Sequence, residues 1–241
     1  MKLTAKDIVL FSGDSITDGN RGHSMDCNHI MGHGYQYIAA GELALENSSE
    51  MPKFINKGYS GYTMGKILET WQEDVIDNKP TYLSILAGVN DGIFGKERGF
   101  TPKQAADNYK NDLDSAVCKT KENLPNTKII ICEPFYFPLD RTNPNFDFTP
   151  HPYCEENHGR PDRDDTDESV QYRLECIGYT RDAAKQIAEK YSLCFVPFYD
   201  CFLKAFKNSK TEYFIWDSTH PTVAGHMLMA KKWLEVTGKA F

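Results

Sequence analysis

Residues 8 to 17 read Ile-Val-Leu-Phe-Ser-Gly-Asp-Ser-Ile-Thr. The successive apolar residues predict a buried strand, and the Gly-Asp pair that follows them predicts a tight turn. This order places Ser15 just beyond the end of a strand, where its hydroxyl can project from the sheet. Ser15 is therefore a candidate nucleophile. The alternative is that Ser15 caps the helix that follows, because serine after Gly-Asp is common turn chemistry.

Short apolar runs alternate with longer helical patterns along the rest of the chain. We expect strands at 7–11, 53–56, 81–88, 128–135 and 193–198, and helices at 34–46, 64–77, 101–120, 168–191, 199–208 and 222–237. Strands separated by helices predict an α/β fold, with a parallel sheet between helices on both faces. We expect a single domain over residues 1–241. In such sheets, sites form beyond the carboxyl ends of the strands.

Residues 136–167 interrupt this alternation with prolines among many Asp, Asn and His residues. We interpret them as a long loop insertion, which in a compact domain is usually a lid, a binding loop or disordered. The aromatic residues in or beside this loop are Phe135, Tyr136, Phe137, Phe146, Phe148 and Tyr153. They suit stacking on sugar rings, or they pack the loop onto the body or onto another subunit.

The composition narrows the classes of partner. A net charge of −7 argues against a nucleic-acid backbone, and no basic cluster suggests an anionic membrane surface. The first apolar run is too short for a secretory signal, and no window reaches the length of a membrane span. A cytoplasmic location is the resulting expectation. Seven cysteines at irregular spacing are expected to be reduced thiols.

Three further segments carry groups that fit around Ser15. Asp217 precedes His220 by three residues, so one turn can hold both, with the carboxylate orienting the imidazole. Asn90 and Gly61 each follow a predicted strand and could donate hydrogen bonds to an oxyanion. Together these groups form the set that acyl transfer needs. The alternatives are that Asp217 or Ser218 only caps the last helix, and that Asn90 and Gly61 are ordinary turn residues.

The four segments are FSGDSIT (11–17), NKGYSGYT (56–63), LAGVNDG (86–92) and DSTHPT (217–222). In this order they resemble the conserved blocks of the SGNH hydrolases, also called GDSL esterases/lipases. The resemblance implies a three-layer α/β/α sandwich with a flavodoxin-like sheet of about five parallel strands. It also implies a triad of Ser15, Asp217 and His220. The oxyanion hole would consist of the Ser15 and Gly61 amides and the Asn90 side chain. One departure is Ile16, which stands where the name-giving motif has leucine.

The expected function is that of a serine esterase that works through an acyl-enzyme, with no metal and no cofactor. Its substrates would be small-molecule or carbohydrate esters of short acyl groups, such as acetyl esters. Asp14 and Arg21 are expected to line the substrate pocket. No nucleic acid and no membrane is expected as a partner, and a homo-oligomer is left open. A lysophospholipase or thioesterase that acts on longer acyl chains is the alternative, because the sequence does not give pocket depth.

Two other functions are alternatives to this one. A metal site is suggested by two groups of potential ligands: His23, Cys27, His29 and His33, and then His151, Cys154 and His158. Such density can bind zinc, but neither spacing matches a standard zinc pattern. The second rival is a binding module that keeps the fold without the chemistry. The presence of every catalytic residue type disfavours it.

Overall fold

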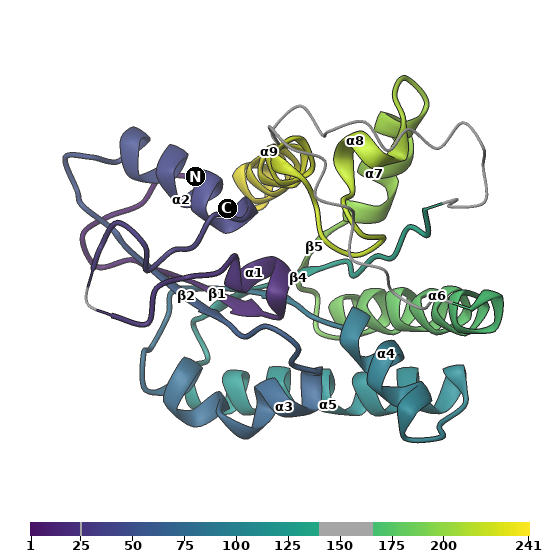
Figure 1. The fold of residues 1–241 in the computed structure, drawn as a ribbon. Coiled ribbons are helices and arrows are strands. Elements are labelled where there is room, and N and C mark those ends of the chain that lie inside the picture. Colours follow the sequence, from purple (N-terminus) through teal and green to yellow (C-terminus); the bar gives the residue numbers. More distant parts are fainter. Residues whose placement is uncertain (25, 140–165) are drawn as a thin grey trace.

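The computed structural model describes residues 1–24, 26–139 and 166–241. Its sheet has five parallel strands in the order β2-β1-β3-β4-β5. Their bounds are Ile8–Gly13 for β1, Lys53–Gly58 for β2, Tyr82–Leu86 for β3, Lys128–Cys132 for β4 and Cys194–Val196 for β5. This order and the layers of Figure 1 confirm the expected three-layer α/β fold.

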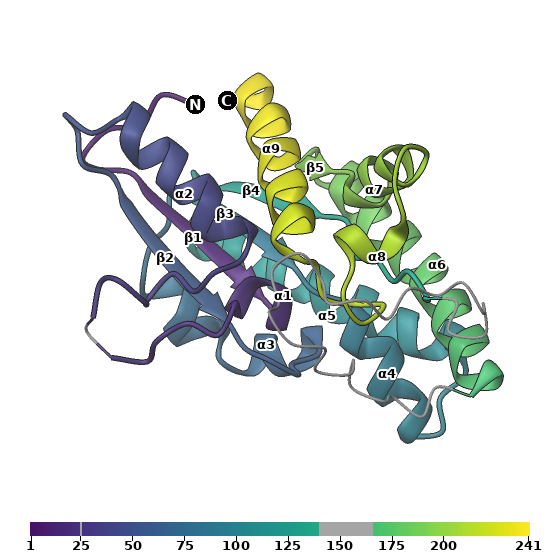
Figure 2. The same cartoon turned by 45° about the horizontal axis from the view of Figure 1, so that its top comes forward.

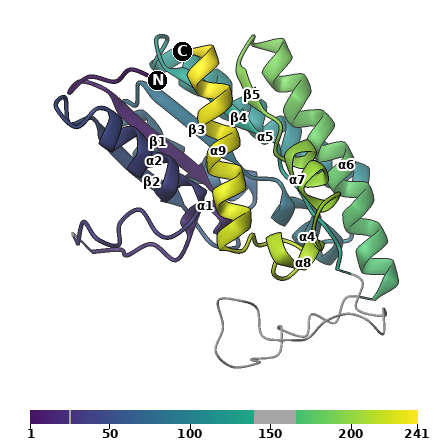
Figure 3. The same ribbon diagram turned by 90° about the horizontal axis from the view of Figure 1, so that it is seen from above.

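The helices form a layer on each face of the sheet (Figures 1 and 3). The first layer contains α2 (Tyr35–Glu46), α7 (Phe198–Phe206) and α9 (Val223–Ala240). The second contains α3 (Met64–Glu69), α5 (Pro102–Asn123) and α6 (Asp167–Lys190). The helix expected at 64–77 is divided into α3 and a π-helical turn, η1 (Gln72–Ile76). Three helices were not predicted: α1 (Ser15–Asp18), α4 (Val89–Glu97) and α8 (Thr211–Phe214).

Side chains of β1 divide between two hydrophobic cores. Phe11 packs with Tyr35 and Trp233 beneath α2 and α9. Leu10 points to the opposite face and belongs to the core that contains Trp71 of the segment between α3 and η1. Successive side chains of a strand alternate between faces, and both faces are covered here. This explains why β1 is an uninterrupted apolar run rather than an alternating one.

The register of the sheet brings the ends of three strands together. Gly13 pairs with Gly58 of β2 and with Leu86 of β3. A Cβ at Gly13 would lie 2.3 Å from the Leu86 carbonyl oxygen and 2.4 Å from Thr17 Oγ1, so only glycine fits there. Because the chain adds β2 on one side of β1 and β3 on the other, this edge is the topological switch point, where ligands bind in such folds. The two termini lie together at the other end of the sheet (Figure 2).

The segment after β4 is part of the core. Phe135, Tyr136 and Phe137 are buried, and their neighbours include Tyr199, which stacks on Phe137 with ring centroids 4.8 Å apart, and Phe202. Stacking of these three residues on a sugar is therefore wrong, and they pack the chain onto the body. Phe146, Phe148, Tyr153 and most of the 136–167 insertion lie outside the described residues. No helix in the described part of the chain is long and apolar enough to cross a membrane.

Candidate active site

Ser15 is the first residue of α1 and lies just beyond the end of β1. Asp14 caps this helix, because its Oδ1 accepts a hydrogen bond from the Ile16 amide at 3.0 Å. The Ser15 hydroxyl is therefore not used as a cap. Its Oγ lies 2.7 Å from Nε2 of His220, which is within hydrogen-bonding distance. The structure thus brings together two residues that are 205 positions apart in the sequence.

A buried carboxylate orients the imidazole. Oδ2 of Asp217 lies 2.8 Å from Nδ1 of His220, and Oδ1 accepts hydrogen bonds from the amides of Thr219 and His220 at 3.1 and 2.7 Å. A carboxylate only accepts, so Nδ1 carries the proton and Nε2 is left to accept from Ser15. The cap of α9 is Thr222, whose Oγ1 accepts from the Gly225 amide, so Asp217 does not cap this helix.

Ser218 forms the turn between Asp217 and His220, whereas the sequence suggested for it only the role of a helix cap, which Thr222 fills. Its φ of 75° lies in the left-handed region, where a residue with a side chain is strained. Two hydrogen bonds keep it there: the Phe137 amide donates to the Ser218 carbonyl at 2.9 Å, and the Leu139 amide donates to its Oγ at 3.2 Å. The segment after β4 therefore supports the turn that carries Asp217 and His220.

Three donors suited to an oxyanion follow the carboxyl ends of β1, β2 and β3. Nδ2 of Asn90 donates one hydrogen to the Tyr62 carbonyl at 3.0 Å, which fixes the amide and leaves its second hydrogen. Gly61 has a φ of 81°, a conformation that glycine adopts without strain. Among the described residues, neither the Gly61 amide nor the Ser15 amide has a hydrogen-bond acceptor. These three groups can therefore donate to a developing negative charge.

Asp91 joins the two segments that supply these donors, and the sequence analysis did not identify it. Its carboxylate accepts from the Met64 amide, with both oxygens at 3.1–3.2 Å. The side chain of Asn90 is hydrogen-bonded to the carbonyl of Tyr62, which lies two residues before Met64. The start of α4 is therefore tied at two points to the segment that follows Gly61, which holds the Gly61 amide and the Asn90 side chain in a constant relation.

Comparisons with known proteins agree with this geometry. A sequence model described as "GDSL-like Lipase/Acylhydrolase family" matches residues 11–228. The chain belongs to this family. It is 31% identical to the acetylxylan esterase of Geobacillus stearothermophilus, over 99% of this chain and 97% of that one. A solved structure of that enzyme, Axe2, superposes with a TM-score of 0.74 at 30% identity, covering 99% and 97% of the two chains.

A second solved structure is also similar over the whole length. It is that of a putative GDSL-like lipase from Parabacteroides merdae, with a TM-score of 0.79 and 31% identity, covering 98% of each chain. These similarities agree with the resemblance that the four sequence segments indicated. As a member of this family, the chain is a carboxylic ester hydrolase.

The segment that carries Ser15 lines a cavity of about 610 Å³. The lining has the polar side chains of Ser15, Asn20, His33, Ser60, His220 and His226 and the apolar side chains of Ile16, Ile38, Trp216, Pro221 and Val223. The cavity can therefore hold an ester that has both an apolar part and a part rich in hydroxyl groups.

Asp14 and Arg21 are not part of this wall, which corrects the expectation that they line the pocket. Asp14 is 1% exposed, and burial raises its pKa to about 6. Arg21 is turned toward the end of β2, where its Nε donates to the Gly58 carbonyl at 3.0 Å and its guanidinium lies 4.9 Å from the Tyr59 ring centroid. Both residues support the segments that carry the site and do not face the cavity.

The first group of candidate zinc ligands lies within the described residues. His29 bonds to Asp26, and His33 lines the catalytic cavity. Within the described ranges, no group of three His, Cys, Asp or Glu side chains is placed to hold an ion. His151, Cys154 and His158 lie outside those ranges.

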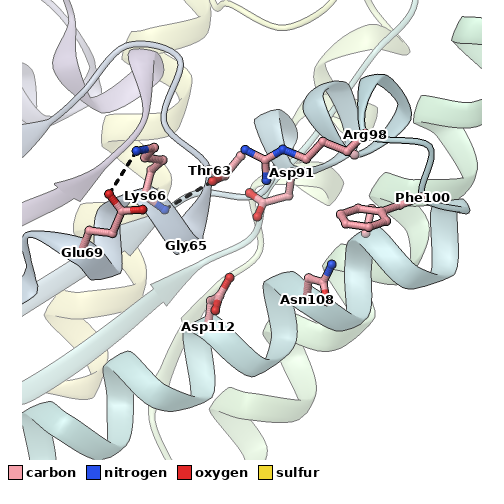
Figure 4. Close-up of a pocket in the computed structure, with 11 residues that line it drawn as sticks. Thr63, Gly65, Lys66, Glu69, Asp91, Arg98, Phe100, Asn108 and Asp112 are labelled. Carbon is pink, nitrogen blue, oxygen red and sulfur yellow. Dashed lines mark hydrogen bonds and ion pairs between the residues drawn. The ribbon is translucent and has the colours of Figure 1, made fainter.

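Figure 4 shows a second, smaller pocket of about 180 Å³ between α3, α4 and α5, where Asp91 and Asp112 point toward the same space. Burial raises the pKa of Asp91 to about 7, with further contributions from the charges of Asp112 and Asp14, while the hydrogen bond from Met64 opposes the rise. Burial also raises the pKa of Asp112. The carboxyl group that ties α4 to α3 therefore holds its proton at a higher pH than an exposed one.

This rise predicts a pH dependence of stability. Between about pH 4 and pH 7 the folded protein binds a proton on Asp91 that the unfolded chain has released, so this group's contribution to stability falls as the pH rises through that interval. Asn can still accept from the Met64 amide and carries no charge. We expect Asp91→Asn to lose less stability than the wild type between pH 4 and pH 8, as measured by urea unfolding.

The matched control is Asp182→Asn, which changes an exposed carboxylate on α6. Its stability should follow the wild-type pH dependence. Parallel curves for the wild type and Asp91→Asn would show that Asp91 releases its proton at the same pH in the folded and unfolded states, against the prediction.

Proposed function

We propose that this protein is a serine esterase that removes acetyl groups from carbohydrate esters. The observation that carries the proposal is the connected line of Ser15 Oγ, His220 and Asp217, with contacts of 2.7 and 2.8 Å. This geometry makes the serine hydroxyl a nucleophile, with the imidazole as its base and the carboxylate as the group that orients the base.

The reaction would proceed in two halves. Ser15 Oγ forms a bond to the ester carbonyl carbon while its proton passes to Nε2 of His220. The carbonyl oxygen becomes negative and accepts hydrogen bonds from the Ser15 and Gly61 amides and from Asn90. The alcohol then leaves with the proton from His220. In the second half, water attacks the acyl-enzyme by the same steps and releases the acid.

The substrate class rests on two supports. The similar protein from Geobacillus stearothermophilus is called an acetylxylan esterase, and variants described as catalytic mutants replace a serine, an aspartate or a histidine of that enzyme. In the present chain, the indole of Trp216 is partly exposed at the cavity wall beside polar groups. An amphipathic wall of this kind suits a sugar ring, which has apolar faces and polar edges.

A longer acyl chain is the second candidate, since Ile16, Ile38 and Val223 give the cavity an apolar side. The test compares kcat/KM for p-nitrophenyl acetate, butyrate and octanoate, followed by acetylated xylo-oligosaccharides. A decrease from acetate to octanoate, with hydrolysis of the acetylated oligosaccharide, is expected. A preference for octanoate would favour a lysophospholipase or thioesterase, and no hydrolysis of any ester would reject the proposal.

A further inference from the structure

His226 lines the same cavity as Ser15 and His220, and the catalytic steps above do not use it. It is the fourth residue of α9, which lies beside α2 over one face of the sheet (Figure 3). The residue is only 8% exposed. Buried polar atoms normally have hydrogen-bond partners, so a partner is expected for each ring nitrogen of this histidine.

The Nδ1 atom has a structural partner. Tyr35, the first residue of α2, donates its amide hydrogen to Nδ1 of His226 at 3.1 Å. The residue before it, Gly34, has no side chain to cap this helix. An imidazole from α9 therefore accepts a hydrogen bond from one of the amides that the start of α2 leaves without a partner. Because an amide only donates, Nδ1 must be the nitrogen without a proton.

The imidazole ring of His226 is also neutral. Burial, with contributions from the neighbouring His33 and His220, lowers the pKa of His226 to about 3. The start of α2 adds the positive end of a helix dipole next to the ring, which also disfavours a cation. A neutral imidazole whose Nδ1 accepts must carry its proton on Nε2. His226 therefore presents one fixed hydrogen-bond donor.

This donor has no acceptor within the described residues, although the rest of the ring is enclosed. Nδ1 is turned to the start of α2, so the part of the ring that remains to line the cavity carries Nε2. Nε2 is not among the buried polar atoms of the described residues that lack a partner, so it is open to the cavity. A bound molecule with an oxygen at this position could accept its hydrogen.

We propose that His226 is a substrate-binding residue, whose Nε2–H donates to an oxygen of the alcohol part of the ester. This inference rests on the proposed function. The oxyanion donors take the carbonyl oxygen, and the bridging ester oxygen is common to all esters, so the acceptors that distinguish an acetylated sugar are its hydroxyl, ring and glycosidic oxygens. His226 thus favours alcohols with such oxygens over purely aromatic or aliphatic ones.

Two substitutions separate this role from the capping of α2. In His226→Asn, the amide oxygen takes the place of Nδ1 and still accepts from Tyr35, but no atom reaches the position of Nε2. In His226→Gln, the amide nitrogen reaches the position of Nε2, but the acceptor for Tyr35 is lost. Stability should therefore decrease more in the Gln variant, while discrimination between substrates should decrease more in the Asn variant.

The measured quantity is the ratio of kcat/KM for an acetylated xylo-oligosaccharide to kcat/KM for phenyl acetate, whose alcohol has no further oxygen. The ratio does not depend on the fraction of enzyme that is folded. We expect it to fall about 5–100-fold in His226→Asn, because a substrate oxygen left without its donor has about the cost of one unsatisfied hydrogen-bonding group. It should fall much less in His226→Gln, and His29→Asn, a control with a 71% exposed side chain, should keep the wild-type ratio.

An unchanged ratio in His226→Asn would overturn the inference, and so would an equal fall in both His226 variants, because a purely structural role predicts those results. The wild type gives a separate control on the proposed function. If it hydrolyses neither ester, the proposed function itself fails, whereas hydrolysis of both esters with an unchanged ratio rejects only the role of His226.

Discussion

Ser15→Ala should lower kcat for ester hydrolysis by at least about 10⁴-fold, because removal of the nucleophile of a triad leaves only the catalysis that the oxyanion donors and substrate binding provide. The Ser15 hydroxyl does not hold the fold together. Asp14 caps α1, and among the described residues Ser15 Oγ has no hydrogen bond other than the one to His220. Activity should therefore be lost without a comparable loss of stability.

The measurement is kcat for phenyl acetate, with thermal unfolding of the same preparations. Ser48→Ala, which changes an exposed serine after α2, is the matched control and should retain full activity. A fluorophosphonate probe should label the wild type and the control but not Ser15→Ala. If Ser15→Ala retains most of its activity, the nucleophile has been assigned to the wrong residue.

Strands β1, β3 and β4 were predictable because each is largely an apolar run that the two helical layers bury. Helix α4 was not, because its sequence VNDGIFGKE has two glycines and begins with turn residues. The structure explains why a helix forms there. A Cβ at Gly95 would lie 2.6 Å from Cβ of Ala105, and one at Gly92 would lie 3.1 Å from Sγ of Cys176. These glycines allow α4 to approach α5 and α6 closely, and this packing overrides their low helix propensity.

The site divides in a similar way. Local spacing suggested that Asp217 and His220 share a turn, and their identity indicated the chemistry. Contacts between segments that are distant in the sequence could not be predicted from it. The hydrogen bond from Tyr35 to His226 spans 191 positions, and the support of Ser218 by Leu139 spans 79. Such pairs depend on how α9 and the segment after β4 pack against the body, which no local pattern in a single sequence records.

Asp14 and Arg21 show that closeness in the sequence does not predict which way a side chain points. Both lie near the nucleophile in the sequence, and proximity along the chain suggested that they face the substrate. In the structure, the turn after Gly13 directs the Asp14 side chain to the Ile16 amide, and Arg21 returns to the end of β2. Direction is set by backbone geometry at the turn, so two polar residues beside a catalytic serine can serve the scaffold rather than the pocket.

The second large effect is expected for Asp217→Asn, although this change preserves the shape of the side chain. Oδ1 of Asp217 accepts from two backbone amides, so the oxygen of an asparagine would remain on that side. Its NH₂ group would then face Nδ1 of His220 and donate to it. The imidazole would have to carry its proton on Nε2, the atom that must accept the proton of Ser15. The base would be held in the wrong tautomer, and kcat should fall about 10⁴-fold.

This mechanism predicts a large loss of activity with little loss of stability, because the asparagine oxygen can still accept both backbone hydrogen bonds. Thermal unfolding should therefore change little, while kcat for phenyl acetate collapses. Asp200→Asn, which alters an exposed carboxylate on α7, is the control and should keep wild-type kcat. A loss of less than about 10-fold in Asp217→Asn would mean that the tautomer of His220 is set by some group other than Asp217, and the triad would have to be reassigned.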